Sequence, residues 1–181
     1  MEFKNTIQAL QKLGGNVIKE GRGILKNFKP HSKIASGALY NQFDYLVTSG
    51  KDNVTLEFEF GKAEDYWQFV DEGVRGAEPS KHKGRPRAAK SPFKYSTKMP
   101  PRGIIDRWIV KRGLKAAREN GKFIERKSLA FLIQRAIYQK GLQRTQFFTR
   151  PFTTQLKKQE KKIVEAFAND LETELKKTFK D

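Results

Sequence analysis

Few side chains of this 181-residue sequence have the types and spacing that catalysis needs. Cysteine is absent, which excludes a thiolate nucleophile, a disulfide and a cysteine metal site. His31 and His82 lie in loop-like stretches without a partner at ligand spacing, and lone loop histidines are mostly surface residues. Glu57 and Glu59 share one face of a predicted strand, where solvated carboxylates are more common than metal ligands. The neighbours Asp71-Glu72 diverge on a helix and cannot cooperate as acid and base.

Nucleotide chemistry also lacks support, because no glycine-rich phosphate loop follows a predicted strand. No apolar run is long enough to cross a bilayer, and the N-terminal residues lack a signal-peptide pattern. We therefore predict a soluble protein that is not an enzyme, binds no cofactor and no metal, and is not exported by a cleaved signal.

The charge of the chain is concentrated in its middle. The net charge is +17, yet residues 1–73 hold 9 Lys or Arg against 10 Asp or Glu, and residues 151–181 hold 7 against 6. Residues 74–150 hold 21 against 4. A near-neutral scaffold with one strongly basic stretch indicates a docking surface for something acidic. Five cations without an apolar anchor mark its most exposed part: Lys81, Lys83, Arg85, Arg87 and Lys90.

The elements that must position this basic stretch are helices and one hairpin. Apolar spacing predicts a helix from Phe3 to about Leu25, with a break at Gly14-Gly15. Ser36 is the predicted N-cap of a short helix with Leu39 and Phe43 on one face. Alternation in residues 54–60, after a turn at residues 50–53 and a strand at residues 45–48, predicts a β-hairpin.

The second half of the chain is predicted to be helical after one long loop. Residues 74–91 form the loop, and a short helix precedes it at residues 65–73. After Met99-Pro100-Pro101 a helix presents one apolar face, which consists of Ile104, Ile105, Trp108 and Ile109. The next helix runs from Ser128, its predicted N-cap, to Gly141, with a buried face of Leu129, Leu132, Ile133, Ala136 and Ile137. The last helix carries a stripe of Leu156, Ile163, Phe167, Leu171 and Leu175.

Several short motifs, read in order, resemble the tail-completion and head–tail joining (neck) proteins of tailed bacteriophages. The small-residue-Gly-x-Leu motif of that family is similar to Ser36-Gly37-Ala38-Leu39. Its aromatic-x-x-aromatic/apolar-Val-Glu-x-Gly motif is similar to residues 66–73, which contain Tyr66, Phe69, Glu72 and Gly73, except that Glu72 directly precedes Gly73 with no residue between them. Its Pro-Phe motif before a final amphipathic helix is similar to Pro151-Phe152. The match covers about residues 1–76 and 141–181.

The resemblance implies an α+β fold: a small antiparallel sheet, with a β-hairpin as its core, flanked by N- and C-terminal helices. Residues 1–76 and 141–181 would form the neck-like core, and residues 77–140 a basic insertion of a loop and two helices, longer than in the smallest members. The resemblance further implies a homo-oligomeric ring in the virion neck, between the head connector and the tail proteins, assembled in the host cytoplasm. Tyr66 to Phe69 and the final helix are the expected contact surfaces between subunits, although core packing explains these residues equally well.

Three interpretations of the basic segment remain open. Lys81, Lys83, Arg85, Arg87 and Lys90 could contact genome duplex DNA through phosphates, dock onto an acidic patch of a neighbouring virion protein, or keep the subunit soluble. Docking onto protein is favoured, because tight DNA binding would hinder passage of the genome. The alternative function is a free-standing basic nucleic-acid-binding protein, in which aromatic residues such as Trp108 stack on bases. Its predicted place on an apolar helix face argues instead that Trp108 packs in the core.

Overall fold

The chain forms two compact units, each built around its own core. The computed structural model describes residues 2–29, 37–78, 88–114, 118–119 and 122–179. The first unit, called the long-helix unit here, comprises residues 1–31, 38–64 and 146–181. The second, called the basic unit, comprises residues 32–37 and 65–145 and holds 21 of the 37 Lys and Arg residues. The predicted domain boundaries at residues 76/77 and 140/141 stay a prediction.

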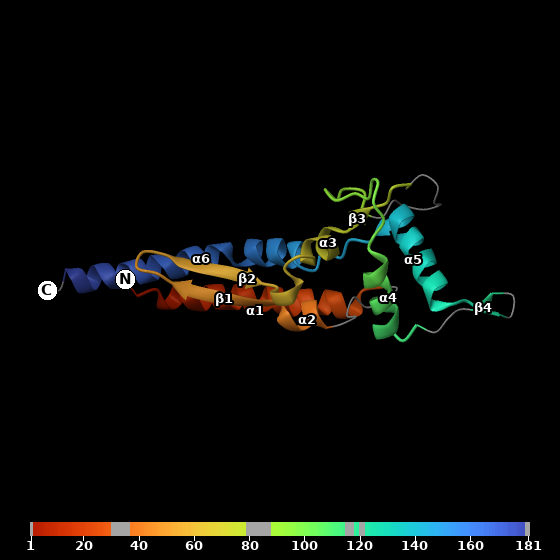
Figure 1. Cartoon of the computed structure of the whole chain (residues 1–181). Helices are drawn as coiled ribbons and strands as arrows, with labels where there is room; N and C mark the ends of the chain where they lie inside the picture. The colour runs from red at the N-terminus through yellow and green to blue at the C-terminus, as the bar shows by residue number, and fades with distance from the viewer. Residues whose placement is uncertain (1, 30–36, 79–87, 115–117, 120–121, 180–181) are drawn as a thin grey trace. The chain divides into compact units, whose positions relative to one another are not determined.

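Two long helices, α1 (Lys4–Asn27) and α6 (Thr149–Thr178), pack side by side in the long-helix unit (Figure 1). They run antiparallel, because Asn5 near the start of α1 contacts Asp170, whereas Asn16 further along contacts Gln155. The helix predicted from residue 3 to about residue 25 is confirmed, and so is the final helix. The pair provides the surface on which the hairpin of this unit packs.

The break predicted at Gly14-Gly15 is wrong, because α1 continues through both glycines. A Cβ on Gly14 would lie 2.4 Å from Cδ2 of the Tyr45 ring, which is closer than real Cβ contacts come. The absent side chain therefore makes room for an aromatic ring of the hairpin. Close packing, and not a change of backbone direction, explains this glycine.

The predicted hairpin is confirmed, and it consists of β1 (Asp44–Ser49) and β2 (Val54–Glu59). The strands are antiparallel over their whole length, and Val47 faces Leu56 in the register. The predicted turn is closed by the amide of Gly50, which donates to the carbonyl of Asn53 at 2.8 Å. Figure 1 shows the hairpin lying along α1 and α6.

Two short helical elements adjoin the hairpin, α2 (Ala38–Gln42) before β1 and the 3-10 turn η1 (Gly61–Ala63) after β2. Leu39 and Phe43 are both buried, as predicted for one face of the short helix. Ser36, its predicted N-cap, lies outside the described residues.

The core of the long-helix unit is an aromatic cluster. Phe43 stacks on Phe60 with ring centroids 5.1 Å apart and meets the edge of Phe147 at 5.3 Å. Phe43 and Phe147 are fully buried. Such edge-to-face and offset pairs add stability beyond the area that they bury. The cluster consists of Phe43, Phe58, Phe60, Phe147, Phe148 and Phe152.

In the basic unit, α3 (Trp67–Glu72) leads directly into β3 (Val74–Arg75), which pairs antiparallel with β6 (Gly141–Leu142). The short helix predicted at residues 65–73 is thereby confirmed in its central part. The loop predicted over residues 74–91 is wrong at its beginning, where β3 forms. The partner strand lies 66 or more positions later in the sequence, and local composition carries no signal for such a distant pairing.

A second helical pair, α4 (Arg102–Lys111) and α5 (Arg126–Lys140), completes the basic unit, with the two-residue strands β4 (Arg118–Glu119) and β5 (Lys122–Phe123) between them. Its core is small. Ile105 and Ile109 pack against Ala130 and the partly buried Leu129, Ile133 and Ile137.

Several predictions about this helical pair need correction. Ile104 and Trp108 were predicted to be core residues, but they are 56% and 37% exposed, because α5 covers only the Ile105–Ile109 side of α4. Leu132 is likewise exposed. Ser128 lies inside α5, whose N-cap is Glu125, whereas Gly141 ends the helix as predicted.

The α+β class is confirmed. The described residues form three two-stranded antiparallel sheets, and the β1–β2 hairpin is flanked by the N- and C-terminal helices of the chain. The helices α4 and α5 lie within the stretch that was predicted to be a basic helical insertion.

Candidate functional site

The candidate site is a surface on α6, which buries its polar side and exposes its apolar side. Gln155, Gln159 and Asp170 are no more than 8% exposed and face α1. In contrast, five apolar side chains are 38–63% exposed. This set, called the α6 stripe here, consists of Leu156, Val164, Phe167, Leu171 and Leu175.

Asp170 is a charged residue that is buried between α1 and α6. Its carboxylate accepts hydrogen bonds from the backbone amides of Asn5 at 3.0 Å and Thr6 at 2.8 Å, and from both of their side chains. These amides belong to the first turn of α1, where Phe3 supplies no side-chain cap. Asp170 is therefore an N-cap that α6 provides to α1, at the positive end of the helix dipole.

Two opposing effects act on the pKa of Asp170. Burial raises the pKa of the carboxyl group, but the hydrogen bonds from Thr6 and Asn5 lower it by more. The pKa of Asp170 consequently lies below its ordinary value, and the carboxylate is charged at neutral pH.

Further along the interface between α1 and α6, the buried polar side chains of α6 are the amides of Gln155 and Gln159. Gln155 donates to the carboxylate of Glu20 on α1 and accepts hydrogen bonds from Gln159 at 3.2 Å and Asn16 at 3.4 Å. Buried polar groups that are paired in this way favour one register between two helices. The interface between α1 and α6 thus has its own polar specificity, and the leucines of α6 are left for another contact.

The α6 stripe is a continuous apolar surface. Val164, Phe167, Leu171 and Leu175 follow one another at spacings of three or four residues, so they lie on one helix face. The Phe167 ring also stacks on Phe3 of the same chain, with ring centroids 6.1 Å apart. Contiguous exposed apolar side chains of this kind mark interaction surfaces more often than scattered ones do.

A second exposed surface lies on α4. Ile104, Arg107, Trp108 and Lys111 are all exposed and are spaced at i, i+3, i+4 and i+7, which places them on one side of the helix. We refer to these four residues as the α4 face. It combines two large apolar groups with two cations. On the neighbouring α5, Phe131 and Leu132 are exposed as well.

The residues of the aromatic-Glu-Gly motif have structural roles in the basic unit. Gly73 ends α3 with φ of 71°, a conformation that favours glycine, and its carbonyl accepts a hydrogen bond from Ser91 Oγ at 2.7 Å. Glu72 lies 3.9 Å from Arg144. These contacts connect α3 to the segments after it, on both sides of β3.

The aromatic members of this motif are half exposed. Tyr66 and Phe69 keep more than a third of their surface accessible, and the Phe69 ring meets the Phe93 ring at 4.5 Å. That they form a contact between subunits stays a prediction.

The other motif residues belong to the long-helix unit or adjoin it. Gly37 precedes α2 with φ of 78°, and Leu39 is buried. Pro151 is buried in the first turn of α6, where its missing amide hydrogen costs little, and Phe152 belongs to the aromatic cluster. The Pro-Phe motif therefore packs in the core of this unit, and its predicted role in a subunit contact stays a prediction.

Most of the predicted basic docking segment lies outside the described residues, namely Lys81, Lys83, Arg85 and Arg87. Lys90 is described and is exposed in a turn. His31 and His82 also lie outside the described residues.

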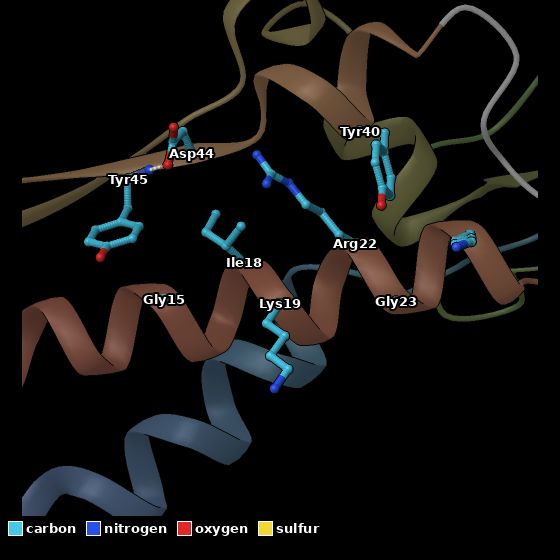
Figure 2. Close-up of a pocket in the computed structure, with 9 residues that line it drawn as sticks. Gly15, Ile18, Lys19, Arg22, Gly23, Tyr40, Asp44 and Tyr45 are labelled. Atoms are coloured by element: carbon cyan, nitrogen blue, oxygen red, sulfur yellow. Dashed lines mark hydrogen bonds between the residues drawn. The ribbon is translucent and has the colours of Figure 1, made fainter.

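A depression of about 550 Å³ in the long-helix unit was not predicted from the sequence (Figure 2). Its cations are Lys19, Arg22 and Lys26, beside Tyr40 and Tyr45. Arg22 is already engaged, because it donates to the carbonyl of Phe43 at 2.9 Å and its guanidinium lies 5.9 Å from the centre of the Tyr40 ring. Arg22 therefore connects α1 to the residue before the first strand of the hairpin.

Two classes of site find no support in the described part of the chain. No three or more of its His, Asp and Glu residues are grouped so that they could hold a metal ion. None of its helices is long and apolar enough to cross a membrane.

Comparison with known proteins gives no assignment: no protein-family model, no curated protein and no solved structure matches this chain. The functional argument therefore rests on the two exposed surfaces, the α6 stripe and the α4 face, and on the motif order in the sequence.

Proposed function

We propose that this chain is a structural virion protein of a tailed bacteriophage, a neck or tail-completion ring subunit that joins the head connector to the tail around the DNA channel. The observation that carries the proposal is the inverted burial of α6. A helix that packs glutamines and an aspartate against its own subunit, and exposes its leucines, has a surface suited to another protein.

The requirements of a ring give further support. Each subunit of a ring must present two different surfaces, one for each neighbour. The chain carries exposed apolar side chains in both of its units, on α6 and on α4 and α5. The specific assignment to the phage neck rests on the order of the Gly-x-Leu, aromatic-Glu-Gly and Pro-Phe motifs around the hairpin.

On this proposal the partners are further copies of the chain and the neighbouring head-connector and tail proteins. The basic segment, with Lys90 as its described member, would dock onto an acidic protein surface or contact genome DNA without sequence preference. The protein would assemble in the bacterial cytoplasm and end in the virion neck. It would act as a structural element and not as an enzyme.

Cryo-electron microscopy of purified virions tests this proposal. We expect a symmetric ring of the subunit between head and tail. Absence of the chain from purified particles, together with salt-sensitive nucleic-acid binding by the isolated chain, would refute the proposal.

One observation favours the alternative, a free-standing nucleic-acid-binding protein. Trp108 is exposed between Arg107 and Lys111 on the α4 face, so a ring that can stack on a base lies beside two cations that can contact phosphates. This corrects the sequence-based argument that Trp108 packs in the core. In this case Trp108→Ala would lower the affinity for single-stranded DNA about tenfold or more, since one stacked base contributes roughly 1–3 kcal/mol. A filter-binding titration at two salt concentrations measures the effect.

A further inference from the structure

We infer that the α4 face of one copy of this chain docks onto the α6 stripe of the next copy. The inference rests on the proposed assembly function and deepens it by naming the two surfaces that meet. The contact is heterologous, because the residues of one surface differ from those of the other, and it can therefore be repeated around a ring.

Both surfaces offer large apolar groups to such a contact. Ile104 and Trp108 stand exposed on α4, and Val164, Leu171 and Leu175 stand exposed on α6. Aromatic residues that fill a groove on a partner are the usual centres of binding energy in protein interfaces. Trp108 is the member of the α4 face that fits this role.

The part of the α6 stripe from Val164 to Leu175 is opposite in charge to the helices α4 and α5. The helices α4 and α5 carry seven Lys or Arg residues and one acidic residue, Asp106. That carboxylate is already paired with Arg126 at 2.9 Å. Residues 163–175 of α6 carry no cation and four carboxylates, of which Asp170 is buried against α1, whereas the four lysines of residues 157–162 border only the Leu156 end of the stripe. Arg107 and Lys111 would thus approach the exposed Glu165, and Glu172, which pairs with Lys176 at the surface, both of which border the stripe; this favours encounter and orientation.

The same charges argue against contacts of each surface with itself. An antiparallel pair of α6 helices in which Val164 of one copy met Leu175 of the other would place Glu165 of each copy beside Glu174 of the other. A pair of α4 faces would bring Arg107 and Lys111 against their own equivalents. Like charges across an interface are unfavourable, so the mixed contact is the one that both surfaces support.

Mixing of two surface variants tests the inference. Leu171→Gln with Leu175→Gln removes the α6 stripe, and Ile104→Gln with Trp108→Gln removes the α4 face. Because all four side chains are partly exposed, glutamine is expected to leave the fold intact, which circular dichroism checks for each variant. A matched control is Leu46→Gln on the hairpin, because the 47% exposure of Leu46 lies between that of Leu171 at 39% and that of Leu175 at 55%.

Analytical ultracentrifugation of wild-type chain is expected to show concentration-dependent association, which the Leu46→Gln control keeps. Each surface variant alone should associate at least about tenfold more weakly. An equimolar mixture of the two variants should form a dimer and grow no further, because each partner retains one intact surface. Growth that stops at two copies is specific to a contact between unlike surfaces.

A second measurement uses charge. Arg107→Glu with Lys111→Glu should weaken association, and Glu165→Lys with Glu172→Lys on the other copy should restore it in a mixture. If the Lys variant of α6 restores association with the Glu variant of α4, both variants must be folded. This measurement therefore stays informative even if a glutamine variant is unstable.

Three results would overturn the inference. Association that depends on the stripe alone would identify a contact of α6 with itself. Loss of DNA binding without loss of association in the Ile104 and Trp108 variant would assign the α4 face to nucleic acid. A wild-type chain that stays monomeric at about millimolar concentration would also overturn it, while a ring seen in virions would leave the proposed function intact.

Discussion

The two units of this chain differ in how they are held together. In the long-helix unit, two helices of 24 and 30 residues pack on a hairpin of two six-residue strands through an aromatic cluster. In the basic unit, the strands are two residues long and the fully buried core of the helical pair is formed by Ile105, Ile109 and Ala130. The basic unit also holds most of the cations. The long-helix unit therefore has the larger core, and the basic unit has more of the cations. This difference can be tested one unit at a time.

The largest effect is expected in the aromatic cluster. Phe43→Ala removes a fully buried ring that contacts four other Phe rings, and such a change costs about 3–5 kcal/mol. Urea unfolding followed by circular dichroism measures it. Phe131→Ala in the basic unit, where the ring is exposed, is the matched control and should cost less than about 1 kcal/mol. Equal costs for both would remove the distinction between the units.

The next effect concerns the small core of the basic unit. Ile109→Ala truncates a buried side chain between α4 and α5 and should destabilise that unit by roughly 2–4 kcal/mol. Hydrogen exchange followed by mass spectrometry should show faster exchange in α4 and α5, while α1 and α6 keep their protection. If exchange accelerated equally in all four helices, the units would unfold together and the comparison would fail.

A smaller effect is expected where α6 caps α1. Asp170→Ala leaves the amides of Asn5 and Thr6 without their acceptor and should lower the stability by about 1–3 kcal/mol at pH 7. Glu165→Gln, on the exposed side of the same helix, is the control.

The pH dependence of this cap has a definite sign. Because the folded-state pKa of Asp170 is lowered, its contribution is present above the unfolded-state pKa near 3.9 and is lost as the pH falls through the lower folded-state pKa. Unfolding free energies measured between about pH 5 and pH 2 should fall less steeply in Asp170→Ala than in the wild-type chain. An unchanged slope would mean that the carboxylate is not the stabilising group.

The smallest effects compare two glycines of α1. Gly23→Ala meets no atom within 4 Å and should stabilise the helix by about 0.5–1 kcal/mol. Gly14→Ala forces Tyr45 away, and overpacking of this kind costs roughly 1–3 kcal/mol. Thermal denaturation should therefore shift in opposite directions for the two variants. Two shifts of the same sign would contradict the role given to Gly14 in seating the hairpin.

The sequence predicted the elements of the long-helix unit because their signals are local. Alternation of apolar residues in 54–60 and the turn at residues 50–53 specify the hairpin, and apolar spacing specifies α1 and α6. Gly14-Gly15 was misinterpreted as a break, since a glycine required by a distant ring looks the same in sequence as one that ends a helix. The pairing of β3 with β6 was missed for a related reason, as each strand is only two residues long.

Of the two surfaces of the candidate site, sequence analysis predicted the α6 stripe but not the exposure of the α4 face. The apolar stripe of the final helix is visible as a pattern, and the sequence assigns it to a sheet or a neighbouring subunit without deciding between them. The apolar members of the α4 face, Ile104 and Trp108, were assigned to a packed side of the helix. The spacing of apolar residues defines such a side but not how much of it a neighbour covers.

The sequence by itself determined the α+β class, the helices, the hairpin and the concentration of charge in the middle of the chain, because each depends on residues that are close together. Only the tertiary structure decided which side of each helix is buried. Asp170 and Gln155 lie against α1 because Thr6, Asn5, Glu20 and Asn16 satisfy their hydrogen bonds there. A polar residue can be buried at low cost when such partners exist. Partners 135 or more positions away exist only once the chain has folded.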